Sequence, residues 1–269
     1  QPGFKKELNE EMLQLYLSLT YVAGENTFFR GLKKLLPGRY LIWQDGKLEI
    51  HRYWKPEFHP DESKTLEDWA DEIHNTLKEI MPEVKTADEK VESFLSGGVD
   101  SSYVLAMSDA EQADSCGYEE ERFDESVLAE KTAQLLGRKF SRSIITPEQF
   151  FDIVPYVMYN MEQPLGDASA IVFTLGCNAT AEHAKICYSG EGSDEFFGGY
   201  NMYRNAERYG ENLKNFYVGN TNIMKEDEKQ KILKKYDPDV LPIELARGIY
   251  EETEGLDPLT KMSDVDIQI

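Results

Sequence analysis

Residues 96–101, Ser-Gly-Gly-Val-Asp-Ser, combine the residue types that bind a polyphosphate. Glycine lets the backbone approach an anion closely, and the N–H groups at the start of a helix attract its oxygens. Ser96 and Ser101 add hydroxyl donors, and Asp100 can hold a cation that bridges phosphates. The Walker pattern differs, because it needs a Lys-Ser or Lys-Thr pair after its glycines. We predict an anion-binding loop; the alternative is an ordinary glycine-rich turn after a strand.

A second polar segment, residues 189–200, has the sequence SGEGSDEFFGGY. Its carboxylates at Glu191, Asp194 and Glu195 repel one another unless a cation neutralises them. Alone, such a segment is as well explained by a solvated acidic turn. Together with the first loop, it favours a cation-dependent phosphate site.

The elements around these loops position both of them. Helical and apolar patterns predict strands at 91–95, 113–118, 139–145 and 185–189, alternating with helices at 100–107, 124–137, 147–161 and 168–183. This alternation predicts an α/β fold, with a parallel sheet and helices on both faces. Ligands of such sheets bind at the carboxyl ends of the strands, so both loops should face one crevice.

The first 60 residues have a different character. They read as short strands and turns, with Asp45-Gly46 at the turn of a hairpin. A polar linker is predicted at 58–64. Thr65 and Asp68 then have the spacing of a capping box, followed by apolar residues at helical spacing.

Composition limits the classes of function. The net charge of −21 repels phosphate backbones, so we expect no nucleic-acid partner. No apolar run is long enough to cross a membrane and no signal peptide is visible, so we expect no membrane association. Three cysteines without CxxC spacing suit a reducing cytoplasm: Cys116, Cys177 and Cys187.

The loop at 96–101 resembles that of the PP-loop family, whose members adenylate a substrate and release pyrophosphate. That family includes GMP, NAD, argininosuccinate and asparagine synthetases and tRNA-thiolating enzymes, and the loop alone does not choose among them. Residues 189–200 resemble the signature of the asparagine synthetase (glutamine-hydrolysing) synthetase domain. Further segments of the chain resemble the same family, at 35–40, 52–54, 115–118, 122–126 and 166–171.

The resemblance implies an adenine nucleotide alpha hydrolase-like fold and a division of the chain. Residues 1–60 would be the C-terminal remnant of a glutaminase domain, and residues 61–269 the ATP-binding synthetase domain. Both ends look truncated. The cysteine nucleophile expected of the glutaminase is missing, and no lysine-bearing segment with Pro-Phe-Leu-Asp is present before Ile269. We therefore expect weak ATP binding and little activity from this chain alone.

The resemblance also implies a set of site residues with ATP and Mg²⁺ as cofactors. Those lining the adenosine would be Leu95, Cys116, Ser189 and Gly190. Those holding the pyrophosphate would be Ser96, Gly97, Gly98, Asp100 and Ser101. Asp100 and Asp194 would be magnesium ligands, and Glu191 would assist the acyl-adenylate chemistry. Cys116 departs from a position that is usually aliphatic.

The implied reaction activates the side-chain carboxylate of aspartate by adenylation, and ammonia from glutamine then gives asparagine. A homodimer is compatible with this resemblance. Two alternatives stay open: a synthetase of the same family acting on another carboxylate, including the β-lactam-forming type, and a non-catalytic ATP-binding module. The histidines show no metal-ligand spacing and are interpreted as structural or solvated: His51, His59, His74 and His183.

Overall fold

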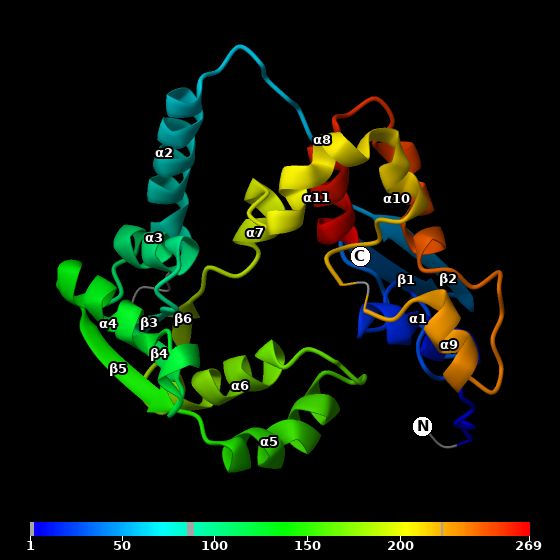
Figure 1. Cartoon of the computed structure of the whole chain (residues 1–269), viewed down its shortest axis with the longest axis horizontal. Helices are drawn as coiled ribbons and strands as arrows, with labels where there is room; N and C mark the ends of the chain where they lie inside the picture. The colour runs from blue at the N-terminus through cyan, green and yellow to red at the C-terminus, as the bar shows by residue number, and fades with distance from the viewer. Residues whose placement is uncertain (1–2, 85–88, 222) are drawn as a thin grey trace. The chain divides into compact units, whose positions relative to one another are not determined.

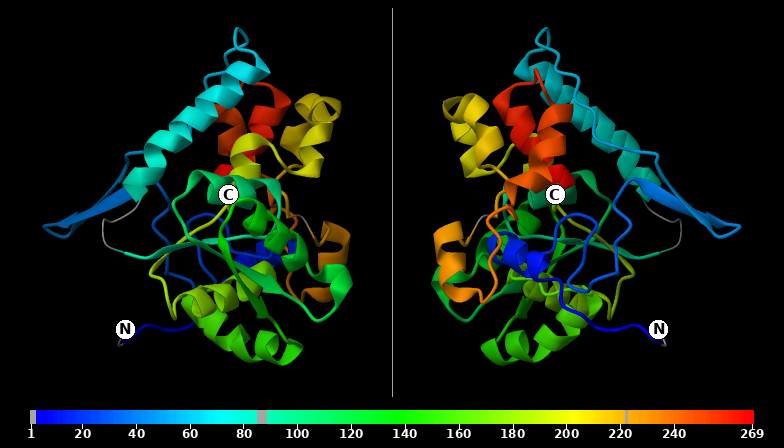
Figure 2. Two further views of the ribbon diagram at one scale, coloured as in Figure 1. Left: turned by 90° about the vertical axis from the view of Figure 1, so that its left-hand side faces the viewer. Right: turned by 90° about the vertical axis from the view of Figure 1, so that its right-hand side faces the viewer.

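The computed structural model describes residues 3–84, 89–221 and 223–269 (Figure 1, Figure 2). The chain forms two compact units. Unit 1 contains Gln1–His59, Met161–Gly166 and Asp194–Ile269, and unit 2 contains Pro60–Asn160 and Asp167–Ser193. Each unit has a hydrophobic core of its own.

Unit 2 is built on a four-stranded parallel sheet. The strand order is β5-β4-β3-β6, with β3 at Val91–Phe94, β4 at Gln112–Gly117, β5 at Lys139–Ile144 and β6 at Ile186–Tyr188. From β3 the chain proceeds outward to β4 and β5, and then returns to place β6 on the other side of β3. The direction of winding therefore reverses between β3 and β6, which is the switch point where such sheets bind ligands.

Helices cover both faces of this sheet, as predicted (Figure 1). On one face, α3 (Val99–Met107) packs on β3, and α4 (Ser126–Leu135) packs on β4 and β5. On the other, α6 (Ser169–Thr180) packs on β4 and on α5 (Pro147–Asn160). The first face holds the apolar core of the unit, with fully buried alanines along β4 and α4.

Helix α2 (Leu66–Val84) begins with the predicted capping box. The N–H of Thr65 donates to Asp68 Oδ2 at 2.8 Å, and the N–H of Asp68 donates to Thr65 Oγ1 at 3.2 Å. The helix has an apolar stripe, yet none of its residues is fully buried. The cap satisfies backbone N–H groups at the start of this helix, where few side chains are buried.

Unit 1 contains the predicted hairpin, with β1 (Arg39–Gln44) antiparallel to β2 (Lys47–Arg52). Asp45 and Gly46 both have positive φ, as the turn of a two-residue hairpin requires. The helices of the unit are α1 (Glu10–Leu19), α8 (Ala206–Tyr209), α9 (Glu226–Ile232), α10 (Ile243–Glu252) and α11 (Pro258–Gln268), and all but the first residue of α7 (Ser193–Phe197) belongs to it as well. Short 3₁₀ turns lie at Glu121–Phe123 in unit 2, and at Asn201–Asn205 and Gly210–Asn215 in unit 1.

The core of unit 1 joins segments that are distant in the sequence. Leu19 at the end of α1 is buried in one cluster with Met262 and Val265 of α11. Beside this core, the Asp266 carboxylate accepts hydrogen bonds from the Tyr217 hydroxyl at 2.5 Å and the Asn220 N–H at 2.9 Å. The N-terminal and C-terminal parts of the chain thus share one core.

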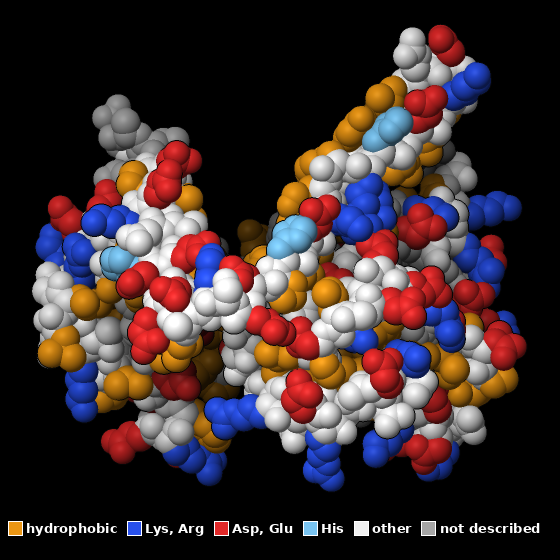
Figure 3. Space-filling model, turned by 90° about the horizontal axis from the view of Figure 1, so that it is seen from above, with side chains coloured by type: hydrophobic (Ala, Val, Ile, Leu, Met, Phe, Trp, Pro, Cys, Tyr) orange, Lys and Arg blue, Asp and Glu red, His pale blue; other side chains and the backbone are white. Residues whose placement is uncertain are grey.

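Charged side chains of both signs are interspersed over the face drawn in Figure 3. In the described ranges, none of the helices has the length and apolar character needed to span a membrane.

Candidate functional site

Two loops leave the carboxyl ends of the adjacent strands β3 and β6 in unit 2. The first is residues 95–101, and the second is residues 189–193. They flank the switch point of the sheet, where the crevice of an open parallel sheet forms. The fold therefore brings together the two segments whose residues predicted a phosphate site.

Hydroxyl groups hold the first loop in shape. The N–H of Ser96 donates to Ser101 Oγ at 3.2 Å, and the two Oγ atoms lie 3.0 Å apart. The N–H of Gly98 donates to Ser96 Oγ at 3.2 Å. These contacts fold the loop around its two serines and direct it into α3.

Gly97 is required at its position for two reasons. Its φ of +85° is in the left-handed region, and a Cβ there would lie 2.9 Å from the backbone nitrogen of Ala129 in α4. Gly98 then takes the N-cap position of α3 and offers no capping side chain. An anion can therefore take the place of a side-chain cap at this helix start.

The second loop contacts the first through its backbone. A Cβ on Gly190 would lie 2.7 Å from the backbone nitrogen of Ser101 and 3.0 Å from the carbonyl carbon of Asp100. The hydroxyl of Ser193 donates to the Gly190 carbonyl at 2.8 Å, and the N–H of Glu191 donates to Ser189 Oγ at 3.1 Å. Any side chain at position 190 would separate the two loops.

Most of the predicted site residues lie in these loops. Ser96, Gly98 and Asp100 are exposed in the first loop, and Glu191 is exposed in the second. A ligand can reach all four from solvent. Among the other residues predicted to contact phosphate, Gly97 is half-buried and Ser101 is buried, so part of the predicted set is open to solvent.

Asp194 lies at the start of the segment that belongs to unit 1. Its backbone carbonyl accepts from the Gly199 N–H at 3.0 Å, and a Cβ on Gly199 would lie 1.9 Å from Asp194 Oδ1. The nearby Tyr200 hydroxyl donates to Glu195 Oε1 at 2.6 Å. Because Asp100 belongs to unit 2, a magnesium ion shared by Asp100 and Asp194 stays a prediction.

Leu95 is buried and Cys116 is half-buried. Leu95 is 1% exposed, and its N–H donates to the Asp114 carbonyl at 2.9 Å. Cys116 Sγ lies 3.8 Å from the Val172 carbonyl, on the α6 face of the sheet. Burial raises the pKa of the Cys116 thiol above its usual range, which favours the neutral thiol over the thiolate.

The structure adds a polar network that the search for site residues missed. At the carboxyl end of β4, the Asp124 carboxylate accepts from the Ser126 N–H at 3.1 Å and pairs with Arg142. A Cβ on Gly117 would lie 2.8 Å from each of these three side chains. The spacing of Asp124 and Ser126 at a helix start was the signal available in the sequence.

Comparisons with known proteins agree with this arrangement. The family model of asparagine synthase matches residues 72–266, and that of a glutamine amidotransferase domain matches residues 1–54. Asparagine synthetase [glutamine-hydrolyzing] 1 of Bacillus subtilis is 29% identical over 303 aligned residues, which cover 97% of this chain and 47% of that protein. The amidase chry2 of Gibberella zeae is 32% identical over 207 residues, covering 68% of this chain and 31% of that protein.

The chain thus spans about half the length of the first relative and about a third of the second. Among solved structures, the glutamine-dependent NAD+ synthetase from Acinetobacter baumannii in complex with ADP covers 82% of this chain and 46% of its own, at 18% identity and a TM-score of 0.36. Because this TM-score is low, the fold assignment rests on the strand order and register described above.

Proposed function

The chain belongs to the asparagine synthase family, and from this premise we propose that its two adjoining loops bind ATP for the adenylation of a carboxylate. The observation that carries the proposal is the contact of Gly190 with the backbone of Ser101 at the switch point. It joins an anion-binding loop and an acidic loop into one accessible surface. Such a surface suits a nucleotide triphosphate bound with a cation.

The residues of the first loop take the phosphate part of ATP in this proposal. The N–H groups at the start of α3 and the hydroxyls of Ser96 and Ser101 would stabilise charge on the departing pyrophosphate. The exposed carboxylate of Asp100 has the oxygen donors that Mg²⁺ prefers, and Asp194 would supply a second carboxylate. Magnesium, when bound, would neutralise phosphate charge during the transfer.

The second loop contributes the remaining groups. Ser189 and Gly190 would border the adenosine together with the backbone of Leu95 and with Cys116. A carboxylate is a poor electrophile, so the substrate must become an acyl-adenylate before an amine attacks it. Glu191 is exposed and its N–H is held by Ser189 Oγ, which suits a role in orienting the amine or accepting its proton.

The substrate that we propose is aspartate, with ammonia derived from glutamine and asparagine as product. The relative from Bacillus subtilis and the glutamine amidotransferase match at residues 1–54 both support this choice. Amidation or cyclisation of another carboxylate is the second candidate, favoured by the similarity to an amidase. A cytoplasmic location, a homodimer, and the division near residue 60 are kept as predictions.

The experiment that tests the nucleotide site compares Asp100→Asn with Glu148→Gln. Both acidic residues lie in the first turn of a helix, but Glu148 is on α5, outside the two loops. We expect Asp100→Asn to weaken binding of ATP with Mg²⁺ to the 269-residue chain at least tenfold, measured by calorimetry. Glu148→Gln should leave binding unchanged, and equal binding by both variants would contradict the proposal.

The carboxylate is identified by a separate measurement. Pyrophosphate exchange into ATP is followed with aspartate, glutamate and other acids, using this chain or a longer one that contains it. We expect exchange to depend on aspartate. If exchange does not depend on aspartate but depends on another acid, that acid is the substrate, and the proposed nucleotide site is not contradicted.

A further inference from the structure

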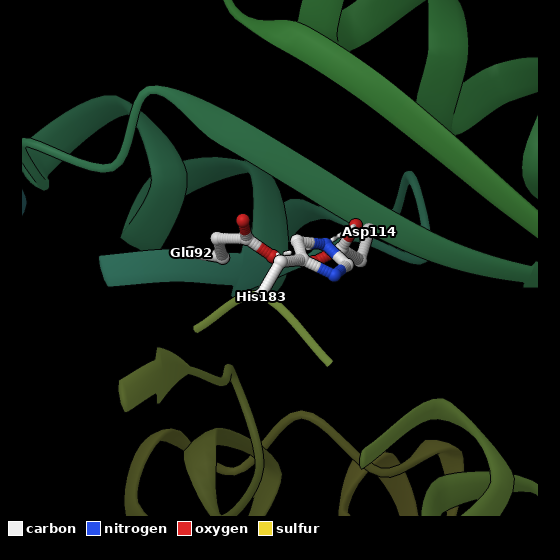
Figure 4. A group of neighbouring side chains, drawn as sticks. All are labelled: Glu92, Asp114 and His183. Atoms are coloured by element: carbon white, nitrogen blue, oxygen red, sulfur yellow. Dashed lines mark ion pairs between the residues drawn. The ribbon is translucent and has the colours of Figure 1, made fainter. Parts of the chain in front are cut away.

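Three side chains that the two loops do not use converge on the α6 face of the sheet in unit 2 (Figure 4). They are Glu92 of β3, Asp114 of β4 and His183, which follows α6. His183 Nε2 lies 2.9 Å from Glu92 Oε2 and 3.9 Å from Asp114 Oδ1. Glu92 precedes Ser96 by about 13 Å of extended chain, so this group is distinct from the phosphate loop.

The carboxylate of Glu92 is enclosed by protein. Its side chain is 0% exposed, and neither of its oxygens accepts a hydrogen bond of ordinary geometry from the described residues. Lys90 Nζ lies 2.6 Å from Oε1 as an ion pair, whereas Oε2 faces the histidine. Burying a carboxylate beside that of Asp114 is costly unless a positive charge lies between them.

The side-chain amide of Gln112 also contacts this group. Gln112 Nε2 lies 3.0 Å from Asp114 Oδ1 and 3.0 Å from His183 Nε2. If the amide donates to both, His183 Nε2 is an acceptor and faces a second acceptor, Glu92 Oε2, at 2.9 Å. A cation placed among the three acceptor atoms would remove this conflict.

We propose that Glu92, Asp114 and His183 bind one divalent transition-metal ion of the Zn²⁺ class. Metal–ligand bonds of about 2.0–2.1 Å place tetrahedral donor atoms about 3.3 Å apart. The distances of 2.9 and 3.9 Å span that value, and all three donor atoms lie within 4.8 Å of one another. An imidazole nitrogen among the donors favours this class of metal over Mg²⁺.

The surroundings provide the supports that metal ligands usually have. The hydroxyl of Thr180 on α6 donates to Asp114 Oδ2 at 3.1 Å, which orients the carboxylate and leaves Oδ1 for the metal. A half-turn of the Gln112 amide would bring its oxygen to where its nitrogen now lies. That oxygen, or a water molecule, supplies the fourth ligand.

The site is structural in character. It ties His183, three residues after the end of α6 and three before β6 begins at Ile186, to β3 and β4. Strand β6 leads directly into the second loop at Ser189. The metal would therefore stabilise the strand that positions Gly190 against the first loop, without contacting the nucleotide.

The test titrates the chelator-treated 269-residue chain with Zn²⁺ and with Co²⁺. We expect one ion per chain, with Co²⁺ giving the strong visible absorption of a low-coordinate site. Glu92→Gln, Asp114→Asn and His183→Gln should each weaken binding more than tenfold. The matched control is His59→Gln, an exposed histidine whose Nε2 lies 3.7 Å from Glu57 Oε2, and it should bind as the wild-type chain does.

A second readout needs no variant, because loss of a buried charge can prevent folding. X-ray absorption of the Zn²⁺-loaded wild-type chain should show the scattering of one imidazole and no sulfur. A sulfur ligand, no saturable binding, or binding that the three substitutions leave intact would overturn the proposal. In those cases, the Glu92 cluster would be explained by a proton shared with its neighbours.

Discussion

At the residue scale, a few positions decide whether the loops can meet. Gly97 combines a left-handed φ with the close approach of α4, and Gly190 lies against the backbone of the first loop. Gly117 leaves room for the Asp124 network at the end of β4. At each position a side chain would clash with backbone or with a charged group. Substitution therefore destabilises the fold through steric overlap and not through the loss of favourable contacts.

The carboxylate of Asp124 makes a pH-dependent contribution to stability. The Ser126 hydroxyl, followed by the Ser126 N–H and the Arg142 charge, lowers the pKa of Asp124 in the folded chain. The unfolded chain then binds more protons than the folded chain, so this contribution is present near neutral pH and is lost as the pH falls through the folded-state pKa.

We expect Asp124→Asn to lower the free energy of unfolding at pH 7, because the ionic hydrogen bonds are lost. The difference from the wild-type chain should shrink as the pH is lowered, as measured by urea unfolding at each pH. Asp152→Asn, on the exposed surface of α5, is the control and should have little effect. A loss of equal size at every pH would show that charge at Asp124 is not responsible.

At the element scale, α2 and α5 allow a matched comparison of capping. Both begin with a reciprocal cap, between Thr65 and Asp68 and between Thr146 and Gln149. Helix α5 packs against α6, whereas α2 has no fully buried residue. The two helices therefore differ in how much their tertiary contacts can compensate for a lost cap.

Replacing either threonine by alanine should cost about 1 kcal/mol at the helix start. For Thr65→Ala we expect faster hydrogen exchange over the first turns of α2, because little packing opposes fraying. For Thr146→Ala the exchange in α5 should change less. Equal acceleration in both helices would mean that packing of α5 on α6 does not protect its first turn.

At the scale of the whole molecule, the two compact units do not follow one another along the chain, because unit 1 contains segments from both ends of the sequence. Residues before 60 share a core with residues after 193, through Leu19 and Val265 among others. Arg52 also donates to the Gln268 side chain at 2.8 Å. The parallel sheet of unit 2 uses none of these residues.

Removal of residues 1–60 should therefore affect the two units unequally. We expect residues 194–269 to lose hydrogen-exchange protection, whereas the strands of unit 2 keep theirs. The point substitutions Leu19→Ala and Leu105→Ala are the matched pair, because both side chains are 0% exposed, one in each core. Each should cost about 2–5 kcal/mol in its own unit. Uniform loss of protection would show that the two units unfold together.

The sequence by itself determined the order of strands and helices in unit 2 and the positions of the hairpin and the α2 cap. Those features depend on local pattern: apolar spacing, capping residues and the two glycines of the first loop. The resemblance of residues 189–200 also identified the family, because that segment is specific to it.

Only the tertiary structure placed β6 beside β3, which joined the two loops at the switch point. It also brought Glu92, Asp114 and His183 together, although Asp114 and His183 are 69 positions apart in the chain. No local pattern encodes such a meeting, because it depends on which strands pair and on which face each side chain lies. His183, which has no metal-ligand spacing in the sequence, lies beside Glu92 and Asp114 because β3 pairs with β4 and α6 packs on β4.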